Sequence, residues 1–382
     1  MHGRRRRGTR AGLVTLGLVA SLAFAATASA NVPFQEIKSP GPISNLWVGN
    51  DLSCQAKLTQ DPVYSYFPPA TAPGDCGTFA QVAPNPAVFA PDFDAHDGTA
   101  AGNAVWVPWT PVSQTPVTGA GTASDPYTVT TSADAGASGI RVSERYTYVT
   151  GSRNYSVDIT VSNNNATART VRLYHAIDCY LAGSDFGYGY FDPATGGVFC
   201  TENPNNSPAG RILGFTPTAG STRYIESFYD TVWDRTDGTD YPNTAEPDLY
   251  QDNGIGLQWT LNIPGATRSA RGAETVGVTG RVDSGDALET AITQGPKKKV
   301  KSKKGKKKAT FQFAATLGGN PVSDATFTCQ VDARAPVPCS SPFTTKVKKG
   351  KHTFQVYASA NGETDSTPAA QQWKLKKKKK KH

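Results

Sequence analysis

Residues 155–162, Tyr-Ser-Val-Asp-Ile-Thr-Val-Ser, carry the clearest structural signal in this chain of 382 residues. Apolar and polar side chains alternate along the stretch. Successive side chains of an extended backbone point to opposite faces, so the apolar ones share one face and can be buried together. The stretch therefore predicts a β-strand with one buried side, made by Tyr155, Val157, Ile159 and Val161.

The same alternation recurs in five further stretches, near residues 140–149, 171–179, 222–230, 257–263 and 273–282. Gly, Pro and Asn separate these stretches and are typical of turns, and little of the chain has a helical period. We therefore predict an all-β protein in which residues 31–288 form a large antiparallel β-sandwich. This body is longer than one immunoglobulin-sized unit of about 100 residues.

Residues 62–126 differ because eleven prolines interrupt them. Proline cannot donate a backbone hydrogen bond within a sheet, which excludes regular central strands over most of this stretch. We expect long loops here that wrap around the sandwich.

The first 30 residues have the features of a secretory signal peptide. Arginines at 4–7 and at 10 precede an apolar run over 11–26, and Ala28-Ser29-Ala30 is a small-x-small cleavage site. The run is shorter than the about 20 residues of a membrane-spanning helix. No later stretch is long and apolar enough to span a bilayer. We expect a secreted, extracellular protein that can attach peripherally to the cell envelope.

The six cysteines agree with export, since disulfides persist in oxidising compartments. They form three pairs of close neighbours in the sequence, although six cysteines allow 15 connectivities. Zinc binding is disfavoured because no Cys-x-x-Cys occurs and histidine is scarce. We predict the disulfides Cys54–Cys76, Cys179–Cys200 and Cys329–Cys339.

Charge is divided unequally along the chain. Residues 31–295 hold 13 Lys and Arg against 27 Asp and Glu, a net charge of −14, whereas residues 296–382 hold 21 against 4, a net charge of +17. The run at 297–308 is expected to be an exposed loop or linker, since lysines repel one another and bury no apolar surface. The lysines that we predict to bind polyanions are Lys297, Lys298, Lys299, Lys301, Lys303, Lys304, Lys306, Lys307, Lys308, Lys376, Lys377 and Lys378.

Export determines which polyanions these lysines can meet. Anionic envelope polymers and lipid headgroups are the expected partners, and specific nucleic-acid recognition is not expected. Binding to such surfaces is nonspecific and steeply dependent on salt. Two alternatives remain, a lysine run that is only solvated and a tail that folds back on the acidic body.

Six short blocks in the C-terminal part resemble a known repeat. Among them are Ala325-Thr-Phe-Thr-Cys-Gln-Val-Asp332 and Gly350-Lys-His-Thr-Phe-Gln-Val356, and the others lie at 290–296, 309–311, 338–342 and 365–369. Together they resemble a small immunoglobulin-like or fibronectin-like repeat of secreted proteins from high-GC soil bacteria. One departure is Asn361-Gly-Glu-Thr, where the family more often has Ala-Gly-Asn.

This resemblance implies a small immunoglobulin-like β-sandwich over residues 289–377, which includes the lysine-rich run, followed by a basic tail at 378–382. It implies that Cys329 and Cys339 bridge a hairpin. The family is understood as a spacer or adhesion module and brings no catalytic residues.

The body also resembles an uncharacterised domain of exported bacterial proteins. The matching stretches are 176–189, Ala-Ile-Asp-Cys-Tyr-Leu-Ala-Gly-Ser-Asp-Phe-Gly-Tyr-Gly, and 252–259, Asp-Asn-Gly-Ile-Gly-Leu-Gln-Trp. This resemblance implies no activity.

Two acidic loops are candidates for Ca²⁺ binding, although neither has EF-hand spacing. Aspartate also favours turns, so clusters can arise without a ligand. We expect no obligatory cofactor, and calcium is the alternative; its candidate ligands are Asp92, Asp94, Asp234, Asp237 and Asp240.

Residues 224–241 interleave acids with aromatic side chains, an arrangement suited to holding sugars. Two carboxylates about 5–9.5 Å apart could also hydrolyse a glycoside. The alternative is a strand with core aromatics. The candidate glycan-binding residues are Tyr229, Asp230 and Trp233.

No nucleophile motif is present, and His175 lies on the presumed inward face of its strand. We expect His175 to be a buried core residue, and we predict no catalytic residue. Our leading hypothesis is a noncatalytic envelope or extracellular matrix protein held to anionic surfaces by its lysines. The alternative is a secreted protein whose acidic body binds or cleaves polysaccharide.

Overall fold

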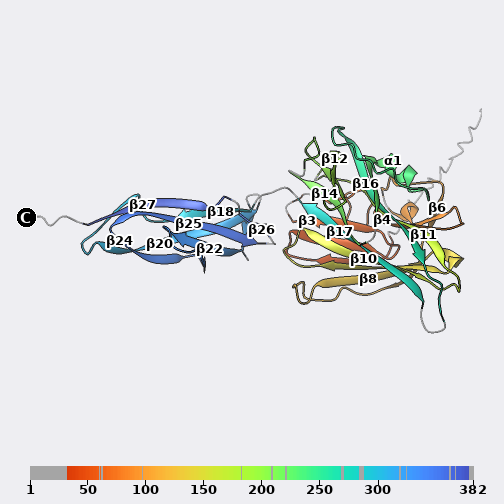
Figure 1. Cartoon of the computed structure of the whole chain (residues 1–382), viewed down its shortest axis with the longest axis horizontal. Coiled ribbons are helices and arrows are strands. Elements are labelled where there is room, and N and C mark those ends of the chain that lie inside the picture. The colour runs from red at the N-terminus through yellow and green to blue at the C-terminus, as the bar shows by residue number, and fades with distance from the viewer. Residues whose placement is uncertain are drawn as a thin grey trace, which may run out of the picture.

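The computed structural model describes residues 32–377 apart from 60, 62, 97, 182, 208–209, 220–221, 268–270, 284–287, 318–319, 324, 361–362 and 366. The predicted signal peptide at 1–30 and the predicted basic tail at 378–382, with Lys378, lie outside the described residues. Strands account for 59% of the chain and helices for 4%, which confirms the all-β prediction. Figure 1 shows two bodies, one built from β1–β17 and the other from β18–β27.

The larger body has one sheet of fourteen strands and one of three. The small sheet has the order β1-β2-β3. The large one runs β6-β5-β4-β11-β16-β12-β13-β14-β17-β10-β9-β8-β7, with β15 added on β16. The strands are β1 (Phe34–Lys38), β2 (Ile43–Gly49), β3 (Cys54–Leu58), β4 (Cys76–Val82), β5 (Val88–Ala90), β6 (Trp106–Pro108), β7 (Thr110–Gln114), β8 (Tyr127–Asp134), β9 (Ile140–Tyr148), β10 (Asn154–Asn163), β11 (Arg169–Asp178), β12 (Phe186–Asp192), β13 (Gly197–Thr201), β14 (Ile212–Ala219), β15 (Arg223–Phe228), β16 (Gln251–Ile263) and β17 (Gly272–Asp283).

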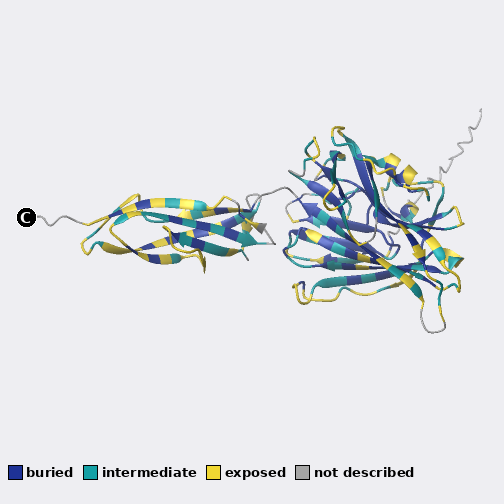
Figure 2. Ribbon diagram, viewed as in Figure 1, coloured by how far each residue is buried: buried dark blue, intermediate teal, exposed yellow. Residues whose placement is uncertain are grey.

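Two halves of the large sheet enclose a common core. Val157 on β10 and Leu173 on β11 belong to one buried apolar cluster, which Leu46 of the small sheet also joins. The sheet thus folds back on itself as a sandwich. The hydroxyls of Tyr66 and Tyr155 meet inside this core at 2.7 Å. Figure 2 shows buried residues along the strands of the larger body and exposed residues mostly in its loops.

The strand patterns in the sequence are largely confirmed. β10 buries Tyr155, Val157, Ile159 and Val161 and leaves Asp158 exposed. β11 and β16 cover the predicted stretches at 171–179 and 257–263 and pair in antiparallel register. Hydrophobic alternation alone was sufficient for these strands.

The proline-rich stretch contains more strand than its prolines suggested. β4 lies between Pro73 and Pro84, is buried along its whole length, and pairs with β5 and β11 as a central strand. Ten consecutive residues without proline allow this. The rest of the stretch is mostly loops and short elements, including a 3-10 helix at Phe93–Ala95; another lies at Gly136–Ser138.

The predicted strand near 222–230 ends at Phe228, and a helix follows. Helix α1 (Tyr229–Arg235) has Tyr229, Val232 and Trp233 at helical spacing, which places them on one face. That face packs on β16 at Gly254, where an added Cβ would lie 3.3 Å from the Tyr229 Cα. The helix thereby covers a second buried apolar cluster.

The smaller body is a sandwich of two sheets. One has the order β18-β20-β21 with β24 on β20, and the other runs β19-β27-β25-β22-β23 with β26 on β25. Phe311, Phe354 and Trp373 pack between them. The strands are β18 (Leu288–Gln294), β19 (Lys299–Ser302), β20 (Lys306–Leu317), β21 (Asn320–Val322), β22 (Thr326–Val331), β23 (Val337–Cys339), β24 (Phe343–Lys348), β25 (Gly350–Ala360), β26 (Glu363–Thr364) and β27 (Ala369–Lys377).

The sequence predicted an exposed loop or linker over the lysine run at 297–308, but only part of the run is a loop. The run contributes β19 and the start of β20, joined by a turn at Gly305, whose φ is +67°. Val300 of β19 packs against the core of the smaller body, and Ala309 of β20 is buried in it. Alternation with these apolar residues lets a highly charged run form strands.

The three predicted disulfides are confirmed: Cys54–Cys76, Cys179–Cys200 and Cys329–Cys339. Cys329 and Cys339 lie in the paired strands β22 and β23, so their bond bridges a hairpin. Three disulfides are typical of extracellular proteins. None of the helices within the described ranges is long and apolar enough to cross a membrane.

Candidate functional site

One end of the smaller body gathers lysines from five strands. The register pairs Lys299 of β19 with Lys374 of β27, and Lys374 with Lys351 of β25. In the other sheet, Lys306 and Lys308 of β20 lie opposite Lys348 and Lys346 of β24. Segments that are up to about 80 positions apart in the sequence are therefore side by side.

Local sequence explains how these strands carry so much charge. Three of them contain a lysine, an apolar residue and a second lysine, at 299–301, 346–348 and 374–376. The central residues Val347 and Leu375 are buried, and Val300 is half-buried. Because side chains alternate in a strand, both lysines of each triplet point to solvent.

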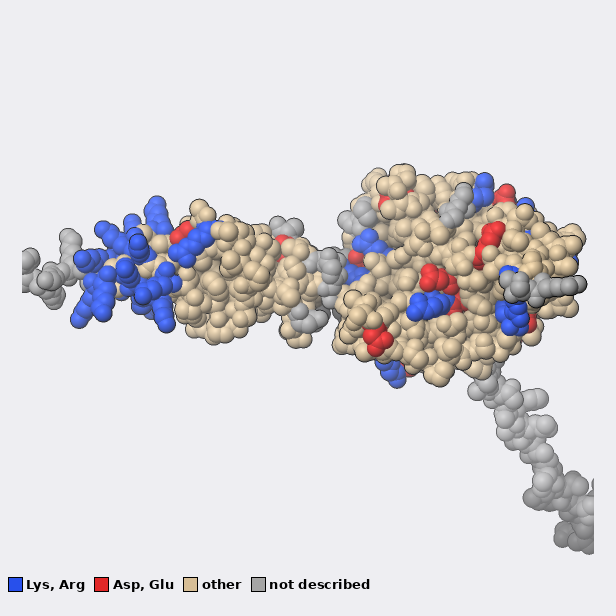
Figure 3. All heavy atoms as spheres, turned by 60° about the horizontal axis from the view of Figure 1, so that its bottom comes forward, with Lys and Arg blue, Asp and Glu red and all other residues tan. Residues whose placement is uncertain are grey.

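We call this the lysine surface, and Figure 3 shows its blue side chains at the end of the smaller body that lies away from the larger one. All of its members are exposed, and within the described part of the chain none forms an ion pair. It comprises sixteen residues: Lys297, Lys298, Lys299, Lys301, Lys303, Lys304, Lys306, Lys307, Lys308, Lys346, Lys348, Lys349, Lys351, Lys374, Lys376 and Lys377.

The pairing carries an electrostatic cost. Like charges directly opposite each other on neighbouring strands destabilise a sheet by about 0.2–1 kcal/mol per pair. Lys374 has such a neighbour on both sides, Lys299 and Lys351. An anion placed between the rows would reduce this repulsion.

Two grooves open within the lysine surface. One, of about 630 Å³, is lined by Lys297, Lys299, Lys301, Lys307 and Lys308, with Trp373 and Leu375 among its apolar walls. The other, of about 530 Å³, is lined by Lys298, Lys351 and Lys374 together with Asp332 and His352. The first groove holds five cations and no acid, which suits an extended anionic chain.

Eleven of the twelve lysines chosen from the sequence lie on the lysine surface, and Lys378 lies outside the described residues. The chosen set did not include Lys346, Lys348, Lys349, Lys351 and Lys374, although the sequence places these lysines in the same module as the 297–308 run. The Lys-apolar-Lys triplets were the available signal for three of them. Their adjacency to the 297–308 run depends on sheet order and could not be read locally.

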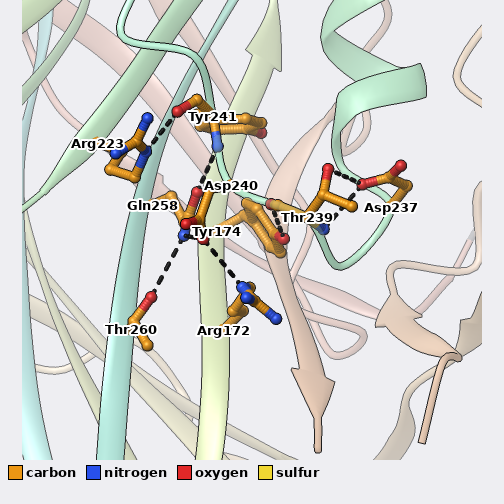
Figure 4. A network of polar contacts seen from close by, with 9 residues as sticks. All are labelled: Arg172, Tyr174, Arg223, Asp237, Thr239, Asp240, Tyr241, Gln258 and Thr260. Atoms are coloured by element: carbon orange, nitrogen blue, oxygen red, sulfur yellow. Dashed lines mark hydrogen bonds and ion pairs between the residues drawn. The ribbon is translucent and has the colours of Figure 1, made fainter.

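In the part of the chain that the structure describes, no three of the calcium candidates bring their carboxylate oxygens together. Asp240 accepts hydrogen bonds from Arg172 at 3.0 Å and from Gln258 at 2.9 Å, and Asp237 accepts them from Thr239 (Figure 4). Among the described residues, the only group of three metal-ligating side chains is Cys54, Cys76 and His175, whose cysteines form a disulfide. Asp92, Asp94 and Asp234 belong to no such group.

The glycan-binding candidates on α1 do not share one environment. Trp233 is fully buried among Phe79, Phe93 and Trp106, with ring centroids 5.8–6.2 Å away. It is a core residue and offers no face to a sugar. Asp230 is exposed and Tyr229 is half-buried.

A different set of aromatic rings is exposed on the body. Phe186 and Tyr250 are 49% and 56% exposed, and their ring centroids lie 5.6 Å apart. Tyr188 contacts Tyr250 at 5.1 Å. These three rings form an aromatic patch at the start of β12. The sequence analysis did not single out these three rings.

Both histidines of the body are buried. The His175 Nδ1 lies 2.8 Å from the Thr78 hydroxyl, and burial lowers the pKa of His175 to about 3. This confirms the predicted core histidine. His96 pairs with Asp51 at 3.0 Å, and Asp51 also accepts a hydrogen bond from Ser53. Because the acid lies between serine and histidine, His96 is not placed to activate that serine.

No family model and no curated protein sequence matches the chain. Among solved structures, it is similar to a heparan sulfate lyase mutant from Pedobacter heparinus, with 9% identity, a TM-score of 0.34 and coverage of 82% of this chain and 42% of that one. A putative aldose 1-epimerase from Escherichia coli K12 gives 13% identity, a TM-score of 0.31 and coverage of 66% and 99%.

A heparinase III gene product gives 8% identity, a TM-score of 0.31 and coverage of 84% and 41%. The chain thus spans about two fifths of the length of the lyase and of heparinase III. TM-scores of 0.31–0.34 are too low to establish a shared fold.

Proposed function

We propose that this is an exported, noncatalytic protein of the cell envelope or extracellular matrix, which is held to anionic surfaces by its lysine surface. The observation that carries the proposal is the collection of sixteen exposed lysines at one end of the smaller body. The smaller body acts as an immunoglobulin-like adhesion module, and the larger body is the part displayed at the surface.

The electrostatics support a polymer or membrane partner rather than a small anion. The lysines extend over both sheets and line two grooves. A small ligand would meet only a few of them. Near an anionic surface each lysine contributes about 1 kcal/mol at low salt, so many of them together give firm binding without a shaped pocket.

The proposal can be tested with full-length mature protein, isolated bacterial envelope and a series of salt concentrations. Cosedimentation should be strong at low salt and should fall steeply as salt rises, because bound counterions are released on binding. Replacing Lys299, Lys301, Lys374 and Lys376 with Gln should weaken binding by about a hundredfold or more and should reduce the slope of affinity against salt.

A matched control removes the same charge from the body. Lys38, Arg145, Arg235 and Arg271 are exposed, and their replacement with Gln should leave cosedimentation unchanged. Equal losses in the two quadruple variants would mean that net charge, and not the lysine surface, controls binding. Unchanged binding in the lysine variant would refute the proposal. Vesicles with anionic lipids and a soluble phosphate polymer separate the two expected partners.

The aromatic patch supports a second candidate, carbohydrate binding by the larger body. Phe186, Tyr188 and Tyr250 offer adjacent apolar rings to solvent, and exposed aromatic groups of this kind mark binding sites more often than scattered apolar residues do. Tyr250→Ala should abolish any binding found on a glycan panel. Leu249→Ala is the control, since Leu249 is equally exposed but has no ring. Binding lost in both variants, or in neither, would exclude the patch.

A further inference from the structure

Four aspartates lie close together where four central strands of the large sheet begin or end. Asp75 precedes β4, Asp178 ends β11, Asp252 lies at the start of β16, and Asp185 precedes β12. These four strands are consecutive neighbours in the sheet. Because antiparallel neighbours alternate in direction, the start of one strand lies beside the end of the next.

Backbone hydrogen bonds join the ends of these strands in sequence, and the Cys179 amide donates to the Asn253 carbonyl at 3.1 Å. The Asp178 amide donates to the Asp75 carbonyl at 2.9 Å, and the Asn253 amide donates to the Asp185 carbonyl at 3.3 Å. Asp252 lies directly opposite Phe186 in the register of β12 and β16. The cluster therefore borders the aromatic patch.

The carboxylates are withdrawn from water and repel one another. Asp178 is 2% exposed and Asp75 is fully buried, whereas Asp185 and Asp252 are half-buried. The charges of Asp75, Asp252 and Asp185 all act on Asp178, because the four carboxylates lie close together.

Three of these carboxylates have an unsatisfied oxygen. Among the described residues, the Oδ1 atoms of Asp178, Asp185 and Asp252 are buried and have no hydrogen-bond partner. Asp75 differs, because it accepts hydrogen bonds from the amides of Ala100 and Ala101 at 3.0 Å. Buried acceptors without donors are costly in a native protein, so these three oxygens are suited to a bound water or cation.

We propose that Asp178, Asp185 and Asp252 form a Ca²⁺ site, with Asp75 held behind Asp178 by its own hydrogen bonds. The ligand atoms are all carboxylate oxygens, the type that Ca²⁺ prefers, and Ca²⁺ accepts flexible geometry. No three of these acids have oxygens within 4.8 Å of one another. Binding therefore requires the half-buried Asp185 and Asp252 to turn toward Asp178. This site shares no residue with the five aspartates chosen from the sequence.

The test is the thermal stability and calcium binding of full-length mature protein after chelation. At saturating CaCl₂ and pH 8, the melting temperature should rise by about 5 °C, and titration calorimetry should detect one Ca²⁺ per chain. MgCl₂ should give a smaller rise, because Mg²⁺ demands a more regular octahedron. A wild-type protein with neither a shift nor binding heat would overturn the proposal.

Two isosteric variants locate the site. Asp178→Asn removes the buried ligand and should abolish the Ca²⁺-dependent shift. Asp94→Asn, at an exposed candidate from the sequence, should keep it. A shift retained in Asp178→Asn, or lost in Asp94→Asn, would place the ion elsewhere. If Asp178→Asn does not fold, the half-buried Asp252→Asn serves instead and should weaken calorimetric binding at least about tenfold; unchanged binding would refute the site.

Discussion

The two bodies of this protein handle charge in opposite ways. The larger one buries ionisable groups, among them Asp178, Glu144 and Glu226, inside or at the edge of its sheets. The smaller one carries its lysines on the surface and, within the described residues, buries only Thr290, Thr345 and Asp365 among polar side chains. Buried charge interacts with its surroundings at low effective dielectric constant, whereas exposed charge is screened by salt.

Glu144 and Asp365 illustrate this contrast at single residues. Burial raises the pKa of Glu144 to about 8, and a hydrogen bond with the Thr78 side chain opposes this shift only in part. Burial of Asp365 acts in the same direction, but hydrogen bonds from Thr290 and Thr367 outweigh it and lower the pKa. Stability of the larger body should therefore depend on pH, and that of the smaller body mainly on salt.

The largest expected effect comes from Glu144. The pKa of Glu144 is about 8 in the folded state and about 4.5 in the unfolded state. At any pH between these two values, the protein therefore takes up a proton when it folds. The free energy of unfolding must therefore fall as the pH rises from about 4.5 to about 8. Glu144→Gln removes this cost and should stabilise the protein by about 3 kcal/mol at pH 7.

Urea denaturation of the full-length protein from pH 5 to pH 8 measures this effect. The gain in Glu144→Gln should grow with pH. Asp158→Asn, at an exposed position of β10, is the control and should show no such trend. A destabilised Glu144→Gln variant at pH 8 would show that the ionised carboxylate has a partner that stabilises it.

A smaller effect of opposite sign is expected from His175. Its pKa is lowered by burial to about 3, so the unfolded chain takes up a proton that the folded protein does not. This contribution to stability is complete above about pH 6.5 and is lost as the pH falls toward 3. At pH 5 the loss should be about 2 kcal/mol.

Thermal unfolding between pH 7 and pH 4.5 can detect it. His175→Gln should flatten the loss on the acid side, since glutamine can still bond to Thr78 but does not titrate. His352→Gln, on the smaller body, should leave the unfolding of the larger body unchanged. If the His175→Gln variant lost as much stability at low pH as the wild-type protein, that loss would belong to other titrating groups.

The smallest effect concerns the lysine surface. Lys374→Gln removes repulsion from Lys299 and Lys351 and should stabilise the smaller body by about 0.5 kcal/mol at low salt. The gain should disappear in 1 M NaCl, where the Debye length is about 3 Å. Lys303→Gln, in the turn before β20, should change little. Equal gains in stability in both variants would mean that the placement of Lys374 between Lys299 and Lys351 has no special effect.

The sequence was most informative where the signal is local. Period-two alternation predicted β10, β11 and β16, because a strand with one buried face needs an apolar residue at every second position. It was less informative at α1, where Tyr229, Val232 and Trp233 have helical spacing but follow directly on a strand. The short proline-free interval that forms β4 was also overlooked among its neighbours.

Sequence by itself determined the all-β class and the concentration of positive charge beyond residue 296, because both depend on residue type and spacing along the chain. It also predicted the three disulfide pairs, since each joins cysteines that are close neighbours in the sequence. Tertiary structure alone decided which of these residues meet. The order of the strands brings Asp75, Asp178, Asp185 and Asp252 together at neighbouring strand ends. It also places Lys374 between two other lysines. Packing of the helix on the sheet buries Trp233. Such contacts join strands that are far apart in the sequence, and only the packing of the whole sheet determines which strands become neighbours.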